Sequence, residues 1–175
     1  AAFMVYSWFA PWWSAKVSVI PGEDHMVLHP WGIEAVAQVR ANADEALYSM
    51  PFPGLFAGFM WTYLAVCMLA LAASLFVTRQ LSLGRFKLPL AVVLIGLVGL
   101  SYMAAVGLAY GIGELKAGWA GANFLGTSQI KNAMTGAKIK MVSDLQIGYW
   151  LALGAGGVLV VLALLRGLFV GRPKA

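Results

Sequence analysis

The chain has 175 residues, of which 61% are hydrophobic and only 11% are charged, with a mean hydropathy of +0.81 and a formal net charge of +5. A soluble domain carries about 25% charged residues, so this composition excludes an ordinary soluble protein and predicts an integral membrane protein. The single cysteine, Cys67, excludes an internal disulfide and a CxxC redox centre.

The N-terminal segment AAFMVYSWFAPWW is apolar, but only residues 1–15 precede Lys16. A helix needs roughly 20 residues to cross the hydrocarbon core, so this run is too short alone. A signal peptide is the competing interpretation, but the tryptophans of the segment are more typical of a membrane interface. We therefore expect residues 1–15 to form the outer half of a first transmembrane helix, with upstream residues missing from the given sequence.

Two patterns stand out in the first predicted outer loop, residues 16–53. The stretch AKVSVIPG alternates apolar and polar residues and ends at Pro-Gly, which predicts a short strand. The stretch WGIEAVAQVRANADEALYSM has a loose apolar face, which predicts a helix that ends before Pro51 and Pro53. This helix would pack on a sheet or lie along the membrane surface, and a solvated linker helix is the alternative.

Three longer apolar runs, at residues 54–78, 89–112 and 148–166, predict complete membrane spans. Up to Leu165 none of them contains Asp, Glu, Lys, Arg or His. Proton relays, ion paths and haem sites inside a membrane need such residues, so this chain alone is not expected to be a pump, a proton-coupled transporter or a cytochrome.

The second outer loop, residues 113–147, ends with another alternating pattern, GAKIKMVSDLQIG, which predicts a second strand. If the first and last helices are neighbours, the two strands leave the membrane side by side. We therefore expect them to pair as an extracytoplasmic sheet.

The two segments RQLSLGRFKLP and RGLFVGRPKA hold six Lys and Arg between them and no Asp or Glu. The rest of the chain holds six Lys and Arg against seven Asp and Glu. The positive-inside rule predicts that both basic segments face the cytoplasm. The net positive charge of the chain is then explained by membrane topology and contact with anionic lipid headgroups, and it does not indicate nucleic-acid binding. The C-terminus would then be cytoplasmic, in a plasma membrane or a bacterial inner membrane.

These observations predict an all-α membrane protein, a bundle of four transmembrane helices whose first helix is partly truncated, with a small extracytoplasmic β/α elaboration from the two outer loops. The predicted segments are a first helix at 1–15, an outer loop at 16–53, helices at 54–78, 89–112 and 148–166, a cytoplasmic loop at 79–88, an outer loop at 113–147 and a cytoplasmic tail at 167–175. The layout resembles that of claudin-like tetraspan proteins. The claudin loop motif with its paired cysteines is absent, so no residue role is carried over.

The stretch GEDHMVLHPWG contains the only two histidines, His25 and His29. Their spacing of four matches a helical zinc motif, but Pro30 disfavours a helix at His29. A loop could still gather Glu23, Asp24, His25 and His29 around zinc or copper. The alternatives are a structural turn and a contact surface for a partner. No other cofactor is predicted, and bound lipids are expected.

Small residues recur every four positions in each span, a pattern that favours close helix packing. Glycine is also simply common in membrane spans, which is the alternative explanation. All seven tryptophans fall in the outer loops or at the outer boundary, as in an interfacial belt or a docking surface. The predicted packing and interface residues are Gly54, Gly58, Gly107, Gly111, Gly148, Ala152, Gly156, Trp31 and Trp119.

The sequence therefore predicts a non-catalytic accessory or scaffold subunit of a larger membrane complex. Its expected partners are other integral membrane subunits, further copies of itself and lipid. The enzyme alternative is a metal-bearing subunit of a membrane oxidoreductase or monooxygenase that uses the His25 and His29 loop. A third hypothesis, the handling of lipid or another small molecule, predicts a wide apolar cavity that opens toward the outer leaflet.

Overall fold

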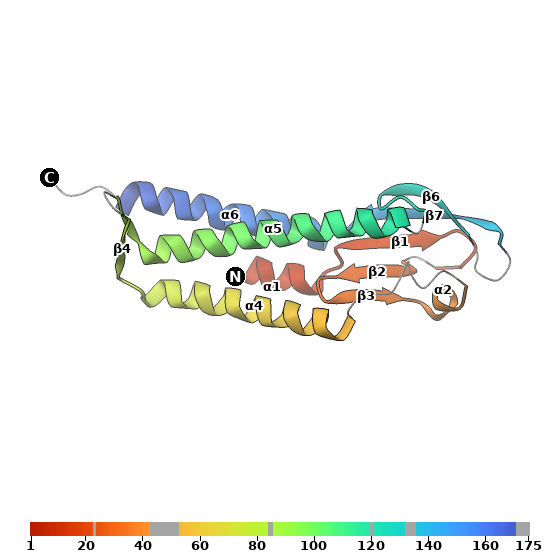
Figure 1. The fold of residues 1–175 in the computed structure, drawn as a ribbon, viewed down its shortest axis with the longest axis horizontal. Coiled ribbons are helices and arrows are strands. Elements are labelled where there is room, and N and C mark those ends of the chain that lie inside the picture. Colours follow the sequence, from red (N-terminus) through yellow and green to blue (C-terminus); the bar gives the residue numbers. More distant parts are fainter. Residues whose placement is uncertain (23, 43–52, 84–85, 120, 132–135, 171–175) are drawn as a thin grey trace.

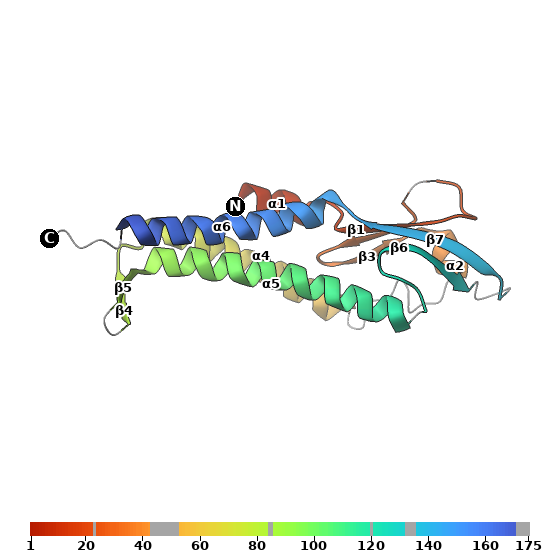
Figure 2. The ribbon, with the colours of Figure 1, turned by 90° about the horizontal axis from the view of Figure 1, so that it is seen from above.

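The computed structural model describes residues 1–22, 24–42, 53–83, 86–119, 121–131 and 136–170. The molecule is elongated, with long helices at one end and a β-sheet at the other (Figure 1). Seen from above, the sheet continues the long axis of the helices (Figure 2).

Three long helices form the end of the molecule away from the sheet. They are α4 (Pro53–Phe76), α5 (Leu90–Trp119) and α6 (Ile147–Val170). Each is long and apolar enough to cross a membrane. The spans predicted from the sequence fall on these helices, but α5 continues past residue 112 to Trp119. Part of the predicted second outer loop is therefore the last two turns of a helix.

The expected fourth span is wrong, and with it the all-α class. The N-terminal helix α1 covers only Ala2–Phe9, and Ala10 has an extended backbone with φ −77° and ψ 147°. Pro11 explains this end, because proline lacks an N–H group and disfavours helical backbone at the preceding residue. By Trp12 the chain is already bonded to the sheet, through its N–H to the carbonyl of Leu28 at 2.8 Å. The described chain is mixed α/β, with three candidate spans and not four.

The sheet has five antiparallel strands in the order β3-β2-β1-β7-β6. The strands are β1 (Trp13–Val17), β2 (Met26–His29), β3 (Gly32–Ala35), β6 (Gly126–Lys131) and β7 (Lys138–Leu145). β1 and β7 lie at the centre, with Ala15 opposite Ser143 and Val17 opposite Met141. This ladder confirms the predicted pairing of the strands that follow the first helix and precede the last.

The helix predicted for residues 31–50 is wrong in its first part. Residues 32–35 form β3, which pairs with β2 through a turn at Pro30 and Trp31. A helix, α2, follows at Ala37–Asn42. Residues 43–50 lie outside the described part of the chain. The strand forms because its backbone groups complete the ladder of β2, for example where Leu28 faces Ile33.

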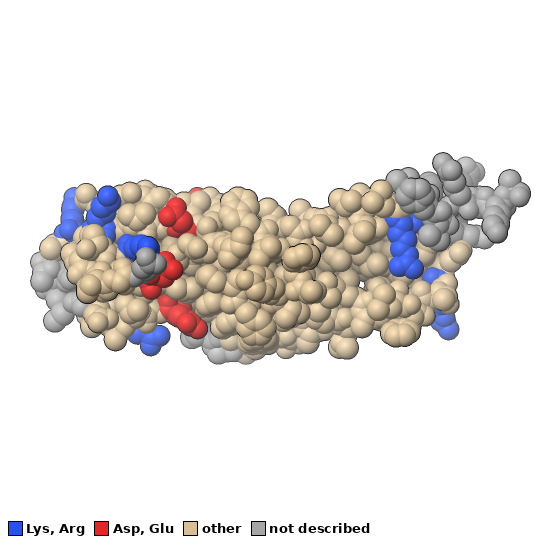
Figure 3. All heavy atoms as spheres, turned by 180° about the vertical axis from the view of Figure 1, so that it is seen from behind, with Lys and Arg blue, Asp and Glu red and all other residues tan. Residues whose placement is uncertain are grey.

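The connection between α4 and α5 is a short hairpin of β4 (Gln80–Leu83) and β5 (Phe86–Pro89). It lies at the same end of the molecule as the end of α6 (Figure 1). Seen from behind, described Lys and Arg side chains occur at both ends, whereas described Asp and Glu occur only toward the sheet (Figure 3). The middle of this face shows no described charged side chain, as expected where helices meet lipid.

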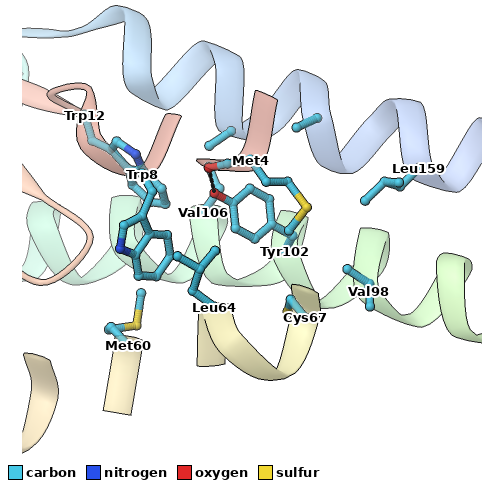
Figure 4. Close-up of a cluster of buried hydrophobic side chains, with 12 residues drawn as sticks. Met4, Trp8, Trp12, Met60, Leu64, Cys67, Val98, Tyr102, Val106 and Leu159 are labelled. Carbon is cyan, nitrogen blue, oxygen red and sulfur yellow. Dashed lines mark hydrogen bonds between the residues drawn. The ribbon is translucent and has the colours of Figure 1, made fainter. Parts of the chain in front are cut away.

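One apolar core lies inside the helix bundle and a second lies against the sheet. In the bundle, Met4 of α1 lies beside Tyr102 of α5, and Trp8 of α1 is fully buried in the same cluster (Figure 4). The Tyr102 hydroxyl lies 3.0 Å from the Ser7 hydroxyl and donates to the Met4 carbonyl at 3.4 Å. The second core includes Trp13, Ala15, Met26, Phe124 and Met141.

Candidate functional site

A cavity of about 400 Å³ lies where α4 and α5 meet the sheet. Figure 1 shows α4 and α5 farther apart here than near the β4–β5 hairpin. Three residues of α4, Phe56, Phe59 and Met60, form one wall. The end of the cavity toward the sheet is formed by Trp12, Trp13, Leu28, His29, Pro30, Ile33, Asn123, Phe124 and Met141.

A single face of α5 forms the opposite wall. It consists of Ala105, Leu108, Ala109, Ile112, Gly113, Lys116 and Ala117. These positions recur every three or four residues, as one face of an α-helix requires. Small residues occupy every fourth position from Ala105 through Ala109 to Gly113. Because Ala105 and Ala109 carry only methyl groups, the space between the two helices stays open there, whereas Gly113 makes room for the ring of Phe124.

Phe124 closes the cavity and is held from three sides. Its carbonyl accepts hydrogen bonds from the Trp13 indole N–H at 2.7 Å and from the Ser143 hydroxyl at 2.9 Å. Its ring stacks on Trp13 with 5.4 Å between centroids and meets the ring of Tyr110 edge-on at 5.5 Å. A Cβ atom at Gly113 would fall on the Phe124 ring, so only glycine fits there.

Large apolar side chains at the cavity are open to the surroundings. Phe59 is 65% exposed and Leu108 is 66% exposed, although both line the cavity. Both belong to candidate membrane spans. A partly enclosed apolar cavity between spans can take up the hydrocarbon part of a ligand.

Polar groups are few in the lining and lie toward the sheet. Lys116 is in the last turn of α5. Asn123 donates from its side-chain amide to the Thr127 carbonyl at 3.3 Å. The ring of His29 stacks on Trp31 with 4.7 Å between centroids, and its Nδ1 atom is buried with no hydrogen-bond partner among the described residues. No Asp or Glu lines the cavity in the described part of the chain.

The two histidines of the predicted metal site lie at opposite ends of β2. His25 is buried, and its Nδ1 accepts a hydrogen bond from the Val17 backbone N–H at 2.8 Å. Four residues along an extended strand span roughly 13 Å. Asp24 is exposed and Glu23 lies outside the described residues. The described residues contain no group of three or more His, Cys, Asp or Glu that could hold a metal ion.

The predicted packing residues divide into two groups. Gly148 packs on the Ala10 and Pro11 carbonyls, Gly156 packs on Met103 and Gly99, and Ala152 is fully buried. These residues join helices within the chain. In contrast, a Cβ atom at Gly58, Gly107 or Gly111 would meet no described atom within 4 Å. Gly54 lies in the first turn of α4.

An aromatic cluster lies beside the cavity. Trp31 stacks on Trp61 with 5.3 Å between centroids, and Trp8 and Phe9 of α1 lie within 6.4 Å of both rings. The predicted interface residue Trp31 therefore joins the sheet to α1 and α4. The second predicted interface tryptophan, Trp119, is 73% exposed at the end of α5.

The cavity wall on α5 was not predicted from the sequence. The feature of the sequence that could have indicated this wall is the series of small residues at 105, 109 and 113, which alternates with the more conspicuous Gly107 and Gly111.

Comparison of the chain with protein families, with curated proteins and with solved structures finds no significant match.

Proposed function

We propose that this chain is a non-catalytic, multi-pass membrane protein that holds the hydrocarbon part of a membrane lipid in the cavity between α4, α5 and the sheet. The observation that carries the proposal is the cavity itself, about 400 Å³ in volume and lined almost entirely by apolar side chains. Ligand pockets usually have volumes of about 300–1,000 Å³ and mainly apolar walls. The described lining residues also lack the paired acids or ligand clusters on which catalysis commonly depends.

The proposal includes an orientation. The β4–β5 hairpin and the C-terminal end of α6 lie together, near Arg79 and Arg166. The positive-inside rule favours a cytoplasmic location for this end, in a plasma membrane or a bacterial inner membrane. The sheet and the mouth of the cavity would then lie on the outer side, and the ligand would enter from the outer leaflet.

A second candidate function is that of an accessory or scaffold subunit, and it is compatible with the first. The open surfaces at Gly58, Gly107 and Gly111 favour it, because small residues let helices of another subunit or another copy approach closely. The exposed Trp119 ring supplies the kind of side chain that often anchors an interface. Purification from native membranes with an intact partner would support this role.

Photo-cross-linking tests the lipid-holding function. The purified chain is reconstituted with a phospholipid that carries a photoreactive group on its acyl chain, and the labelled peptides are identified. We expect labelling of α5 around residues 105–112 and of α4 around residues 56–60. Ala105→Phe fills the cavity and should reduce this labelling at least severalfold.

The adjacent variant Ala104→Phe is the matched control. Ala104 is exposed and does not line the cavity, so the same added volume there points toward the surroundings. Equal labelling in both variants, or labelling spread evenly over all exposed helix faces, would show that the lipid is only annular and would contradict the proposal.

A further inference from the structure

We propose that the lipid held in the cavity has an uncharged ring headgroup with carbonyl oxygens, as a prenyl quinone has, and that one carbonyl accepts a hydrogen bond from His29. This inference rests on the proposed lipid-holding function and adds the chemical class of the ligand. It follows from where the rings of the lining lie, from the depth of that region and from the hydrogen bonds that the polar lining groups already make.

Aromatic and aliphatic side chains occupy different parts of the lining. The wall on α5 is aliphatic through Ala105, Leu108, Ala109 and Ile112. The rings lie toward the sheet, in segments of the sheet or beside it and in the first turns of α4, which begins next to β3 (Figure 1). They belong to Trp12, Trp13, His29, Phe56, Phe59 and Phe124. Because aromatic rings pair favourably with other rings, the lining fits a ligand with a hydrocarbon tail and a ring at one end.

The aromatic end of the cavity lies at the edge of the hydrocarbon layer. At 1.5 Å per residue, Phe56 lies about 30 Å along α4 from Phe76, and the hydrocarbon core is about 30 Å thick. With Phe76 near one boundary of the core, Phe56 is therefore near the other. Ala105 lies about 22 Å along α5 from Leu90, among the acyl chains. An uncharged ring can lie at this depth at little cost, whereas an ionic headgroup would lose much of its hydration there.

Most polar groups of the lining already have partners. The indole N–H groups of Trp12 and Trp13 donate to backbone carbonyls at 2.8 and 2.7 Å. The side-chain amide of Asn123 donates to a backbone carbonyl at 3.3 Å, and Lys116 has an interaction of its own within the chain. The described lining is therefore poorly suited to a phosphate headgroup, which would need several donors to offset its buried charge.

His29 is the exception among these groups. Trp31 covers one face of its ring, with 4.7 Å between centroids and 5° between planes, and Trp31 itself does not line the cavity. The Nδ1 atom of His29 is buried without a partner among the described residues, which leaves Nε2 as the ring nitrogen that a ligand can reach. A neutral imidazole with its proton on Nε2 is a single donor.

A quinone headgroup matches this arrangement. Its ring is planar and uncharged, so it can stack against aromatic side chains without the cost of burying a charge. Its carbonyl oxygens only accept hydrogen bonds, and one of them can accept from His29. Its prenyl tail supplies the hydrocarbon part that the space between α4 and α5 receives.

Competition against the photoreactive phospholipid tests the inference. The purified full chain is labelled in the presence of increasing decylubiquinone or decanol, which share an alkyl tail and differ in the headgroup. We expect decylubiquinone to halve the labelling of α5 at a concentration on the order of tenfold lower than decanol, as ring contacts and one hydrogen bond allow. Labelling of helix faces outside the cavity corrects for light absorbed by the quinone. Equal competition by the two compounds would overturn the inference.

Two variants at residue 29 test the hydrogen bond. His29→Phe keeps a ring beside Trp31 and removes both nitrogens, so it should weaken competition by decylubiquinone severalfold and leave competition by decanol unchanged. His29→Gln keeps an N–H donor and should retain more of the advantage of decylubiquinone. Wild-type competition in His29→Phe, or equal losses in both variants, would overturn the assignment of the headgroup contact to His29.

The lipid-holding function and the choice of headgroup fail in different ways. If Ala105→Phe loses the labelling and Ala104→Phe keeps it, but decylubiquinone and decanol compete equally in the wild type, the cavity holds a lipid and the ring headgroup is overturned. If Ala105→Phe and Ala104→Phe are labelled equally, the lipid-holding function itself is overturned.

Discussion

Gly99 of α5 and Gly156 of α6 lie backbone to backbone, and a Cβ atom at Gly99 would come within 2.9 Å of the Gly156 carbonyl oxygen. It would also lie 3.0 Å from the Leu159 Cβ atom. This contact lets the two helices approach closely, which is how helices associate in a membrane, where there is no hydrophobic driving force between them. Of the two roles predicted for Gly156, packing between helices and an interface for partners, this contact is packing within the chain.

Gly99→Ala is therefore expected to destabilise the chain. The added methyl group meets backbone and Cβ atoms that cannot rotate away, so the helices must separate locally, at a cost of about 1–3 kcal/mol. Denaturant titration of the purified protein in micelles measures this change. Gly107→Ala on the same helix adds the same group where no described atom lies within 4 Å and should be near neutral. Equal losses in both variants would contradict the close-contact explanation.

Tyr102→Phe tests how α1 is held to the bundle. The variant removes the hydroxyl that lies 3.0 Å from Ser7 and donates to the Met4 carbonyl, inside a fully buried environment. We expect a loss of about 1 kcal/mol in the free energy of unfolding, because Ser7 keeps its own hydrogen bond to the Met4 carbonyl at 2.9 Å.

Tyr63→Phe provides the comparison. The Tyr63 hydroxyl also pairs with a serine, Ser101, at 3.0 Å, but this pair is exposed. Tyr63 and Ser101 both lie in candidate membrane spans, so the exposed pair would face lipid and no water would replace the lost hydrogen bond. We therefore expect a similar loss of about 1 kcal/mol, measured by the same titration. A much smaller loss for Tyr63→Phe than for Tyr102→Phe would contradict this explanation.

The His25 and His29 region is expected to behave as a structural turn. His25→Ala leaves the Val17 N–H without its acceptor in a buried position, which should cost about 1–3 kcal/mol of stability. His29→Ala removes no hydrogen bond between described residues and should cost less. Elemental analysis should give the same zinc and copper content for the wild type and for the double variant. A stoichiometric metal that disappears in the double variant would restore the metal-site hypothesis.

The structural features that depend on composition or alternation over a long stretch of residues could be predicted from the sequence. The three uncharged runs became α4, α5 and α6, and the alternating patterns near Ala15 and Met141 became paired strands. Two local features were missed for physical reasons. Pro11 ended α1 early, and the turn at Pro30 and Trp31 drew residues 32–35 into a hairpin although their spacing also suited a helix.

The cavity could not be predicted from the sequence, because it depends on the separation of two helices. The small residues at 105, 109 and 113 look the same whether they receive a neighbouring helix, as Gly99 does, or leave a space. Only the position of α4 relative to α5 and the ring of Phe124 distinguish these outcomes. The sheet contributes to this long-range geometry, because Trp13 of β1 and Ser143 of β7 hold Phe124 through its carbonyl.

Gly113→Ala tests whether Phe124 is the fixed wall of the cavity. The new methyl group would collide with the ring of Phe124, which stacks on Trp13. The backbone carbonyl of Phe124 also accepts hydrogen bonds from Trp13 and Ser143. Because the ring cannot swing away freely, we expect a loss of about 1–3 kcal/mol in stability and weaker labelling by the photoreactive lipid. Gly118→Ala, on the same helix with no described atom within 4 Å of its Cβ position, should change neither.

A double variant separates this collision from a general effect of alanine at residue 113. Phe124→Leu alone removes the ring and should destabilise the chain, but it also makes room for a side chain at residue 113. Gly113→Ala should therefore cost less in the Phe124→Leu background than in the wild type, with a coupling energy of about 0.5–3 kcal/mol. If the two losses simply add, the ring of Phe124 does not restrict residue 113 and is not the fixed wall of the cavity.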